Sequence, residues 1–398
     1  MNASAIGPLS ASGEVCASFS DGQWRDLDVA RAADDEKVAV ASILKALRNE
    51  LSLIASAETL VVLAGSGCSL GIGAGKAGKC APKMSDLWTR VEGLESYATV
   101  KARLSPTVID SGNLEHVLSE AQARLSLEPS DVALGTFVRD AEEIVWTECN
   151  FIDEGSDLDK HQLFLRKVGR RSTRLQRTQI FTTNYDRAFE EAAGRTRFNV
   201  IDGFGYGARR FDGGSFDLDY VRRRPNEQLA LEPNVFHLLK LHGSVDWHDD
   251  GTVINRVEGR PGNPVLIYPS ATKYQLSYRQ PYLEFMSRFQ IALRQPNVGL
   301  IVVGFGFNDD HLNAPIEAAI RSNTGLRSIF VTPAAKGASN SSTIGWIERL
   351  ILLGDRRLTL FNATFDQLVR ALPDGPEQED VDLHADRIAQ QARPGSTS

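Results

Sequence analysis

Polar side chains with catalytic potential follow two short apolar segments of this sequence. Asn184 and Asp186 come at the end of QIFTTNYD, residues 179–186, and His242 lies within LLKLHGSVDW, residues 238–247. An amide such as Asn184 both donates and accepts hydrogen bonds, so it can orient a hydroxyl group or a water molecule. Imidazole titrates near neutral pH and is the commonest general base, which makes His242 the candidate proton acceptor. We predict that these three residues are catalytic.

Each of them also has a structural interpretation. An asparagine at a strand end commonly forms an Asx turn or a helix cap. Asp186 is equally well explained as a helix N-cap. A histidine such as His242 can be a hydrogen-bonded core residue. The residue types alone therefore leave both interpretations open.

A glycine-rich turn follows the apolar segment Leu60–Ala64. That segment is typical of a strand buried on both faces of a parallel sheet. Gly65 and Gly67 allow a tight turn in which backbone N–H groups could point at a phosphate, although such a turn needs glycine in any case. A second glycine-rich segment, GFGFNDDH, follows the apolar residues 299–303. The predicted nucleotide-binding residues are Ala64, Gly65, Ser66, Gly67, Ser69, Thr183, Gly304, Gly306 and Asn308.

Alternating apolar segments and helical patterns predict an α/β fold with a Rossmann-like, doubly wound, mostly parallel sheet. In such sheets, ligands bind at the carboxyl ends of the strands, where the polar residues above would meet. The expected strands are 60–64, 179–183, 198–201, 237–241, 265–268, 298–303 and 328–331.

The sequence also predicts how the chain is divided. Residues 1–33 are rich in Ser, Ala and Gly and are expected to be a flexible segment. Residues 34–372 form the expected catalytic domain, and apolar stripes at helical spacing predict an all-helical insert at about 85–174. Residues 373–398 are polar and are expected to be a tail.

The order GSGCS, TTNYD, LHGS and GFGFNDDH resembles the sirtuin-like NAD hydrolases of bacterial antiphage systems, over roughly residues 59–370. The resemblance implies that NAD is the substrate, that nicotinamide and ADP-ribose are the products, and that no metal is needed. It assigns catalysis to Asn184 and His242. It further implies a homo-oligomer that pairs with a HerA-type ATPase and depletes NAD in antiphage defence. Breaking this glycosidic C–N bond requires an oxocarbenium-like transition state, as in glycoside hydrolysis.

The sequence departs from the deacylase branch of the sirtuins at two places. Deacylases usually hold a small lobe with a four-cysteine zinc site, whereas Cys16, Cys68, Cys80 and Cys149 are far apart and form no C-x-x-C pair. Gly306 stands where deacylases commonly have a serine. An NAD-dependent deacylase, an ADP-ribosyltransferase and a non-catalytic NAD or ADP-ribose sensor remain as alternatives.

Gly73, Gly78, Lys79 and Cys80 come close to a P-loop, but Cys80 replaces the Ser or Thr that holds magnesium. A flexible flap over the nucleotide is the preferred interpretation, with Lys76 and Lys79 either near a phosphate or solvated.

Composition limits the classes of partner. The 398 residues carry a formal charge of −7, so binding to nucleic acid would need a local basic patch, and Arg209, Arg210 and Arg222 to Arg224 are more simply explained as a solvated face. No secretory signal or membrane-spanning segment is recognisable, and a cytoplasmic location is expected.

Overall fold

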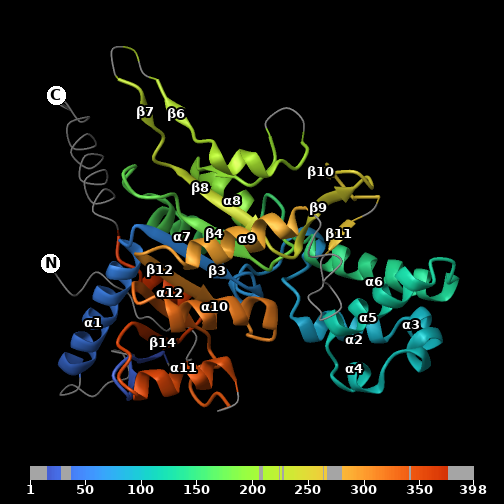
Figure 1. Cartoon of the computed structure of the whole chain (residues 1–398), viewed down its shortest axis with the longest axis horizontal. Coiled ribbons are helices and arrows are strands. Elements are labelled where there is room, and N and C mark those ends of the chain that lie inside the picture. The colour runs from blue at the N-terminus through green and yellow to red at the C-terminus, as the bar shows by residue number, and fades with distance from the viewer. Residues whose placement is uncertain are drawn as a thin grey trace, which may run out of the picture.

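A nine-stranded sheet forms the centre of the molecule in the part of the chain that the computed structural model describes (Figure 1). The described residues are 16–27, 37–205, 209–223, 225, 228–262, 264–266, 280–339 and 342–374. The order of the strands is β2-β1-β14-β13-β12-β3-β4-β8-β5. The parallel strands are β3 (Thr59–Ala64), β4 (Gln179–Thr182), β5 (Asn199–Ile201), β8 (Val235–Lys240), β12 (Val298–Val303), β13 (Leu326–Val331) and β14 (Leu358–Asn362). The predicted mostly parallel α/β sheet is confirmed.

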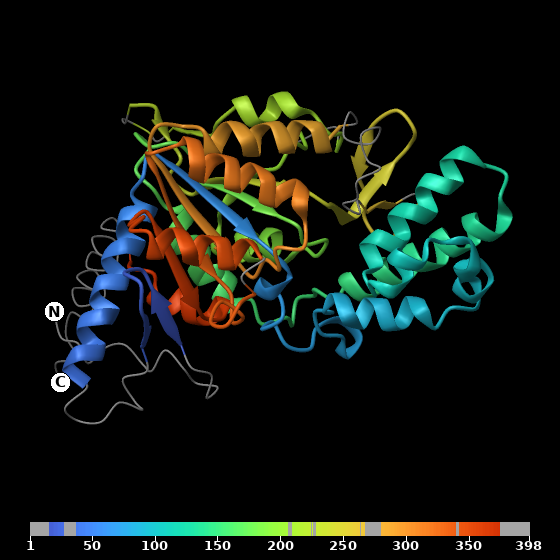
Figure 2. The same cartoon turned by 60° about the horizontal axis from the view of Figure 1, so that its bottom comes forward.

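Helices cover both faces of this sheet, as a doubly wound fold requires. Leu60 and Val62 of β3 pack into one apolar core, and Val61 and Leu63 pack into the other. The first core also contains α1 (Lys37–Ala55), α7 (Asp159–Gly169), α8 (Ala188–Thr196) and α12 (Phe365–Ala371). The second contains α9 (Tyr282–Leu293), α10 (Asp310–Ser322) and α11 (Thr343–Leu352). Figure 2 shows these layers on either side of the strands.

The two strands nearest the N-terminus extend the sheet on one side. β1 (Ala17–Phe19) pairs antiparallel with β14, and β2 (Trp24–Asp26) pairs antiparallel with β1. The expectation that residues 1–33 are flexible throughout is therefore wrong for these strands. Residues 1–15 and 28–36 lie outside the described residues, as does the tail from residue 375 onward.

A helical unit projects from the end of the sheet at which the parallel strands terminate (Figures 1 and 2). It consists of α2 (Met84–Glu92), α3 (Glu95–Val100), α4 (Pro106–Asp110), α5 (Leu114–Leu127) and α6 (Val132–Cys149), which share an apolar core of their own. We call these helices, residues 84–149, the insert. The sequence placed an all-helical insert at about 85–174; α7 lies within that range but packs against the sheet instead of against the insert.

Beside the insert lies a small antiparallel sheet of β10 (Ile254–Arg256), β9 (Gly243–Asp249) and β11 (Pro264–Leu266). The described part of the strand expected at 265–268 belongs here and not to the central sheet, because Pro264 and Leu266 pair with His248 and Gly243 of β9. A hairpin of β6 (Val221–Arg222) and β7 (Ala230–Leu231) completes the strands of the described chain.

Candidate functional site

The two glycine-rich turns meet at the point where the winding direction of the sheet reverses. β3 and β12 are neighbours, and the chain continues from them toward opposite edges. Ligands of doubly wound proteins bind at such a switch point. Here the turns touch through their backbones. A Cβ atom on Gly65 would lie 2.5 Å from the Gly304 carbonyl oxygen, and one on Gly67 would lie 2.7 Å from the Gly304 Cα. Gly304 itself has a φ of 63°, which favours glycine.

The backbone amides of this turn bond to protein. The Gly65 N–H donates to Val303 O at 2.9 Å, and the Gly67 N–H donates to Gly304 O at 2.9 Å. The Ser69 N–H donates to Ser66 O, and the Thr183 N–H donates to Ala64 O at 3.1 Å. The sequence suggested that amides here could point at a phosphate. Instead, the glycines serve the close approach of two loops, and these amides have carbonyl partners.

Asn184 and Asp186 are joined through Ser69. The Asn184 side-chain amide donates to the Ser69 hydroxyl at 3.0 Å, and that hydroxyl donates to Asp186 Oδ2 at 2.8 Å. Asp186 Oδ1 accepts from the Ala188 N–H at 2.9 Å, so the structural role at the start of α8 is also present. Burial raises the pKa of the Asp186 carboxyl, although nearby Lys240 and the hydrogen bonds from Ala188 and Ser69 oppose that rise. One predicted nucleotide contact, Ser69, thus holds the two predicted catalytic side chains.

Asn184 Oδ1 is buried and has no hydrogen-bond partner among the described residues. A buried carbonyl oxygen without a donor costs about 1–3 kcal/mol, and such atoms call for an explanation such as a missing ligand. Because the other end of the amide is fixed by Ser69, the orientation of this oxygen is set. Asn184 therefore presents an acceptor that suits a ligand hydroxyl.

A buried lysine holds the loop that carries Asn184. Lys240, at the end of β8, is 2% exposed. Its Nζ donates to the carbonyl oxygens of Tyr185, at 3.2 Å, and of Asp186, and it lies 3.0 Å from Glu190 Oε1. The sequence reasoning did not select this lysine, although a charged residue closing a buried apolar strand is the signal that could have found it.

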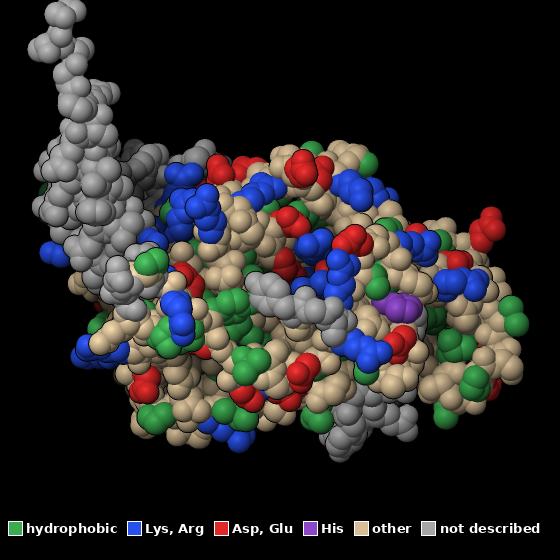
Figure 3. Space-filling view, turned by 90° about the horizontal axis from the view of Figure 1, so that it is seen from above, with side chains coloured by type: hydrophobic (Ala, Val, Ile, Leu, Met, Phe, Trp, Pro, Cys, Tyr) green, Lys and Arg blue, Asp and Glu red, His purple; other side chains and the backbone are tan. Residues whose placement is uncertain are grey.

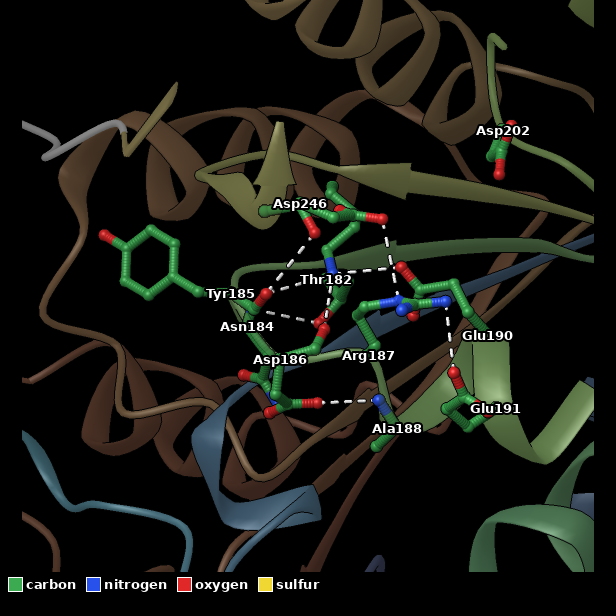
Figure 4. Close-up of polar contacts among 12 residues, drawn as sticks. Thr182, Asn184, Tyr185, Asp186, Arg187, Ala188, Glu190, Glu191, Asp202 and Asp246 are labelled. Carbon is green, nitrogen blue, oxygen red and sulfur yellow. Dashed lines mark hydrogen bonds and ion pairs between the residues drawn. The ribbon is translucent and has the colours of Figure 1, made fainter. Parts of the chain in front are cut away.

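A second set of charges fixes the same loop from its other side (Figure 4). Arg187 lies 3.1 Å from Glu191 and 3.6 Å from Asp246, while Asp246 also pairs with Arg256 at 3.2 Å. The Tyr185 ring points away from Arg187 in this view and packs into the core of the insert. The loop after β4 is therefore anchored on both sides.

His242 is paired with an acid from a distant part of the sequence. Its Nε2 lies 3.0 Å from Asp309 Oδ2, and the residues are 5% and 6% exposed. Burial by itself would raise the pKa of Asp309, but the hydrogen bond and charge of His242 and the charge of His311 lower it overall. An ionised Asp309 accepts from Nε2–H, which leaves Nδ1 as the basic nitrogen of the neutral ring.

The turn that carries His242 requires glycine at the next position. Gly243 has a φ of 93°, and a Cβ there would lie 1.9 Å from the Val265 carbonyl oxygen. The segment also bonds to the Asn184 loop, because the Leu241 N–H donates to Thr182 O at 2.8 Å and the Val245 N–H donates to Tyr185 O at 3.1 Å. Asn184 and His242 are thus brought onto adjoining segments.

The remaining predicted nucleotide-binding residues are less buried than Asn184 and His242. Ser66, Gly306 and Asn308 are exposed, and Thr183 is partly buried. Asp309 caps α10 by accepting from the His311 N–H at 3.0 Å, and its other oxygen binds His242. Lys79 pairs with Glu148 at 3.1 Å, which argues against a role as a free phosphate-binding lysine.

Three further observations concern metal binding, membrane-spanning helices and surface charge. Within the described ranges, no group of three or more His, Cys, Asp or Glu side chains is arranged to hold a metal ion. None of the helices in the same ranges is long and apolar enough to cross a membrane. On the face shown in Figure 3, Lys and Arg side chains are mixed with Asp and Glu.

Comparison with known proteins shows that part of the chain matches the model of one protein family. Residues 178–346 match the model of the SIR2-like domain. This segment contains Asn184, His242 and Asp309 but covers less than half of the chain. No curated protein matches. The sirtuin-like segment therefore includes the candidate catalytic residues, while β3 and the insert precede it.

Two solved structures are among those that match. A mutant Sir2 homologue in complex with ADP-ribose is 16% identical, with 76% of this chain and 94% of that chain covered and a TM-score of 0.33. A Sir2 mutant with a deacetylated peptide and 3′-O-acetyl ADP-ribose is 14% identical, with 82% and 96% covered and a TM-score of 0.34.

Proposed function

We propose that this protein is an NAD glycohydrolase that cleaves NAD with water into nicotinamide and ADP-ribose. The observation that carries the proposal is the buried Asn184 Oδ1, which is fixed in direction and has no donor among the described residues. A ribose hydroxyl or the attacking water is a donor that fits it. The SIR2-like match over residues 178–346 supports NAD as the source of that ribose.

The paired histidine supplies the proton acceptor. With Nε2 directed at Asp309, Nδ1 of His242 can take a proton from a ribose hydroxyl or from water. In the overall reaction, the water oxygen bonds to the ribose carbon, the glycosidic C–N bond breaks, nicotinamide leaves as a neutral ring, and the proton passes from His242 to solvent. Asp309 stabilises the imidazolium that forms, as the acid does in a catalytic triad.

The fit to the nucleotide differs between its two ends. At the ribose end, Asn184 and the His242–Asp309 pair offer an acceptor and a base. At the phosphate end, the amides of Gly65 and Gly67 already bond to carbonyl groups, so phosphate binding would rest on the exposed Ser66 and on residues around Gly306.

The test is chromatography of NAD incubated with purified protein. We expect nicotinamide and free ADP-ribose to appear in equal amounts, and both to appear about 10²-fold or more slowly with an Asn184→Ala variant that remains folded. ADP-ribose found on protein would instead indicate a transferase, and removal of an acyl group from a lysine peptide would indicate a deacylase. Binding of ADP-ribose with NAD left intact would indicate a sensor.

The resemblance of the motifs also leads us to propose a biological setting, in which a homo-oligomer pairs with a HerA-type ATPase and depletes NAD during phage infection. A constitutive NADase would kill its host, so the free protein should be nearly inactive until a partner shifts its conformation. Sedimentation of the protein alone and with the product of a neighbouring ATPase gene tests this. A monomer that is fully active and unchanged on mixing contradicts both the assembly and the control.

A further inference from the structure

The insert supplies a carboxylate to the free side of His242. Glu115 lies in the first turn of α5, whose N-cap Asn113 accepts from the Glu115 N–H at 2.9 Å. Glu115 Oε1 is 3.9 Å from His242 Nδ1, and the two side chains are 14% and 6% exposed. This separation is too long for a hydrogen bond. It is close enough for a strong charge interaction in a region that water screens poorly.

Two other contacts set the position of the insert beside His242. The Tyr185 ring and Val245 belong to the apolar core of the insert, although both come from the catalytic segments. In addition, the Trp146 Nε1–H of α6 donates to the Val245 carbonyl oxygen at 2.8 Å. Because Tyr185 follows Asn184 and Val245 comes three residues after His242, the insert is attached at both catalytic segments.

We infer that Glu115 is a positioning residue for His242, so that the insert completes the catalytic base. This inference rests on the proposed NAD hydrolysis. Nδ1 is the nitrogen that Asp309 leaves basic, and Glu115 is the carboxylate that faces it. When Nδ1 takes up a proton, Glu115 and Asp309 face the two nitrogens of the cation. A cation between two carboxylates is more stable than one beside a single carboxylate.

The other titratable groups near this pair are few among the described residues. Tyr185 faces His242 with ring centroids 6.4 Å apart. The charge of His311 helps to lower the pKa of Asp309. Burial, with a smaller effect from Asp309, raises the pKa of Tyr282 to about 12, so Tyr282 stays neutral through the range of the assay. Glu115 and Asp309 are therefore the carboxylates that lie against the two nitrogens of His242.

The test is the pH–rate profile of a Glu115→Gln variant. Loss of the charge makes His242 easier to deprotonate, so the acidic limb should move to lower pH by about one unit. The maximal kcat should fall at the same time, by at most about tenfold, because the protonated ring is less stable. A purely structural role would lower activity without moving the limb.

Glu95→Gln is the matched control, because Glu95 is also the first-turn carboxylate of an insert helix and is exposed. Its profile should superimpose on that of the wild type. A superimposable profile for Glu115→Gln, or an equal displacement with Glu95→Gln, overturns the inference.

A second measurement separates this inference from the proposed function. NMR titration of the His242 ring reports the effect of Glu115→Gln whether or not NAD is cleaved. If the wild type leaves NAD intact but the ring midpoint moves in Glu115→Gln, the proposed function fails and the contact stands. If NAD is cleaved and the midpoint is unchanged, the role of Glu115 fails alone.

Discussion

His242 and Asp309 form a buried hydrogen-bonded pair, with Nε2 and Oδ2 3.0 Å apart, although 67 residues separate them in the sequence. His242 follows β8 and Asp309 precedes α10, so two segments on opposite sides of β3 in the strand order contribute one functional group. The second oxygen of Asp309 caps α10. The position of the base is thus tied to the start of a helix.

The first prediction separates these two roles of Asp309. Asparagine keeps an oxygen that can cap α10, so Asp309→Asn should fold normally. It loses the negative charge beside His242, and turnover should fall by about 10²–10⁴. Steady-state kinetics with thermal unfolding measures both effects. The neighbouring exposed Asp310→Asn is the control, and activity of Asp309→Asn close to that of the wild type would refute the pairing as a catalytic feature.

The second prediction compares Asn184 with the residue that holds it. Asn184→Ala removes the unpaired acceptor Oδ1 and should lower turnover by roughly 10² or more. NAD binding, measured by calorimetry, should largely be retained. Ser69→Ala leaves the amide in place but loses one hydrogen bond, so its loss should be smaller. Nicotinamide release by soluble Asn184→Ala at the wild-type rate is incompatible with the proposed mechanism.

The third prediction concerns the contact between the glycine turns. A Cβ on Gly67 would approach the Gly304 Cα to 2.7 Å, so Gly67→Ala should lower the free energy of unfolding by about 1–3 kcal/mol. It should also weaken NAD binding, because the turn must shift. Gly71→Ala is the matched control, since no heavy atom lies within 4 Å of its Cβ position. Equal denaturation midpoints for the two variants would contradict this prediction, because they would show that the turns accommodate the Cβ of residue 67 without loss of stability.

The same experiment tests the lysine that resembles part of a P-loop. Lys79 is paired with Glu148, so Lys79→Ala should weaken NAD binding much less than Gly67→Ala does. Loss of binding in Lys79→Ala together with a requirement for magnesium would restore the P-loop interpretation.

The fourth prediction concerns the dependence of stability on pH. His161 of α7 is 1% exposed, packs against Phe189 and Phe365, and has no hydrogen-bond partner for either ring nitrogen in the described chain. Burial, aided by Lys160 and opposed by Asp157, lowers its pKa to about 3. The folded state keeps the ring neutral while the unfolded chain is protonated below about pH 6.5. Stability should therefore be complete above that pH and fall as the pH decreases toward 3.

Urea unfolding at pH 7 and pH 5 measures this loss, which His161→Leu should reduce. Part of the pH dependence should remain, because burial also lowers the pKa of His237 to about 4. His116→Gln, at an exposed position, is the control. An equal loss of stability between the two pH values in wild type and His161→Leu would exclude His161 as the cause.

The sequence by itself determined the class of fold and most of the candidate residues. Continuous apolar segments such as Val298–Val303 are typical of strands buried on both faces of a sheet. This prediction does not require knowing which strands lie on either side. Polar residues placed directly after such strands meet at one edge of a parallel sheet, so Asn184 and His242 could be selected without coordinates.

The tertiary structure alone decided which groups interact. Three-residue strands such as β1, β2 and β11 have too few residues for a periodic signal, and their sheet depends on which backbone edge is available. Three sets of contacts join residues far apart in the chain. The amides of the first glycine turn donate to the carbonyl oxygens of Val303 and Gly304. His242 contacts Asp309 through one ring nitrogen and Glu115 through the other. Hydrogen bonds and charge contacts depend on distances in space. These distances are set when the sheet and the insert pack, so the spacing of residues in the sequence does not predict them.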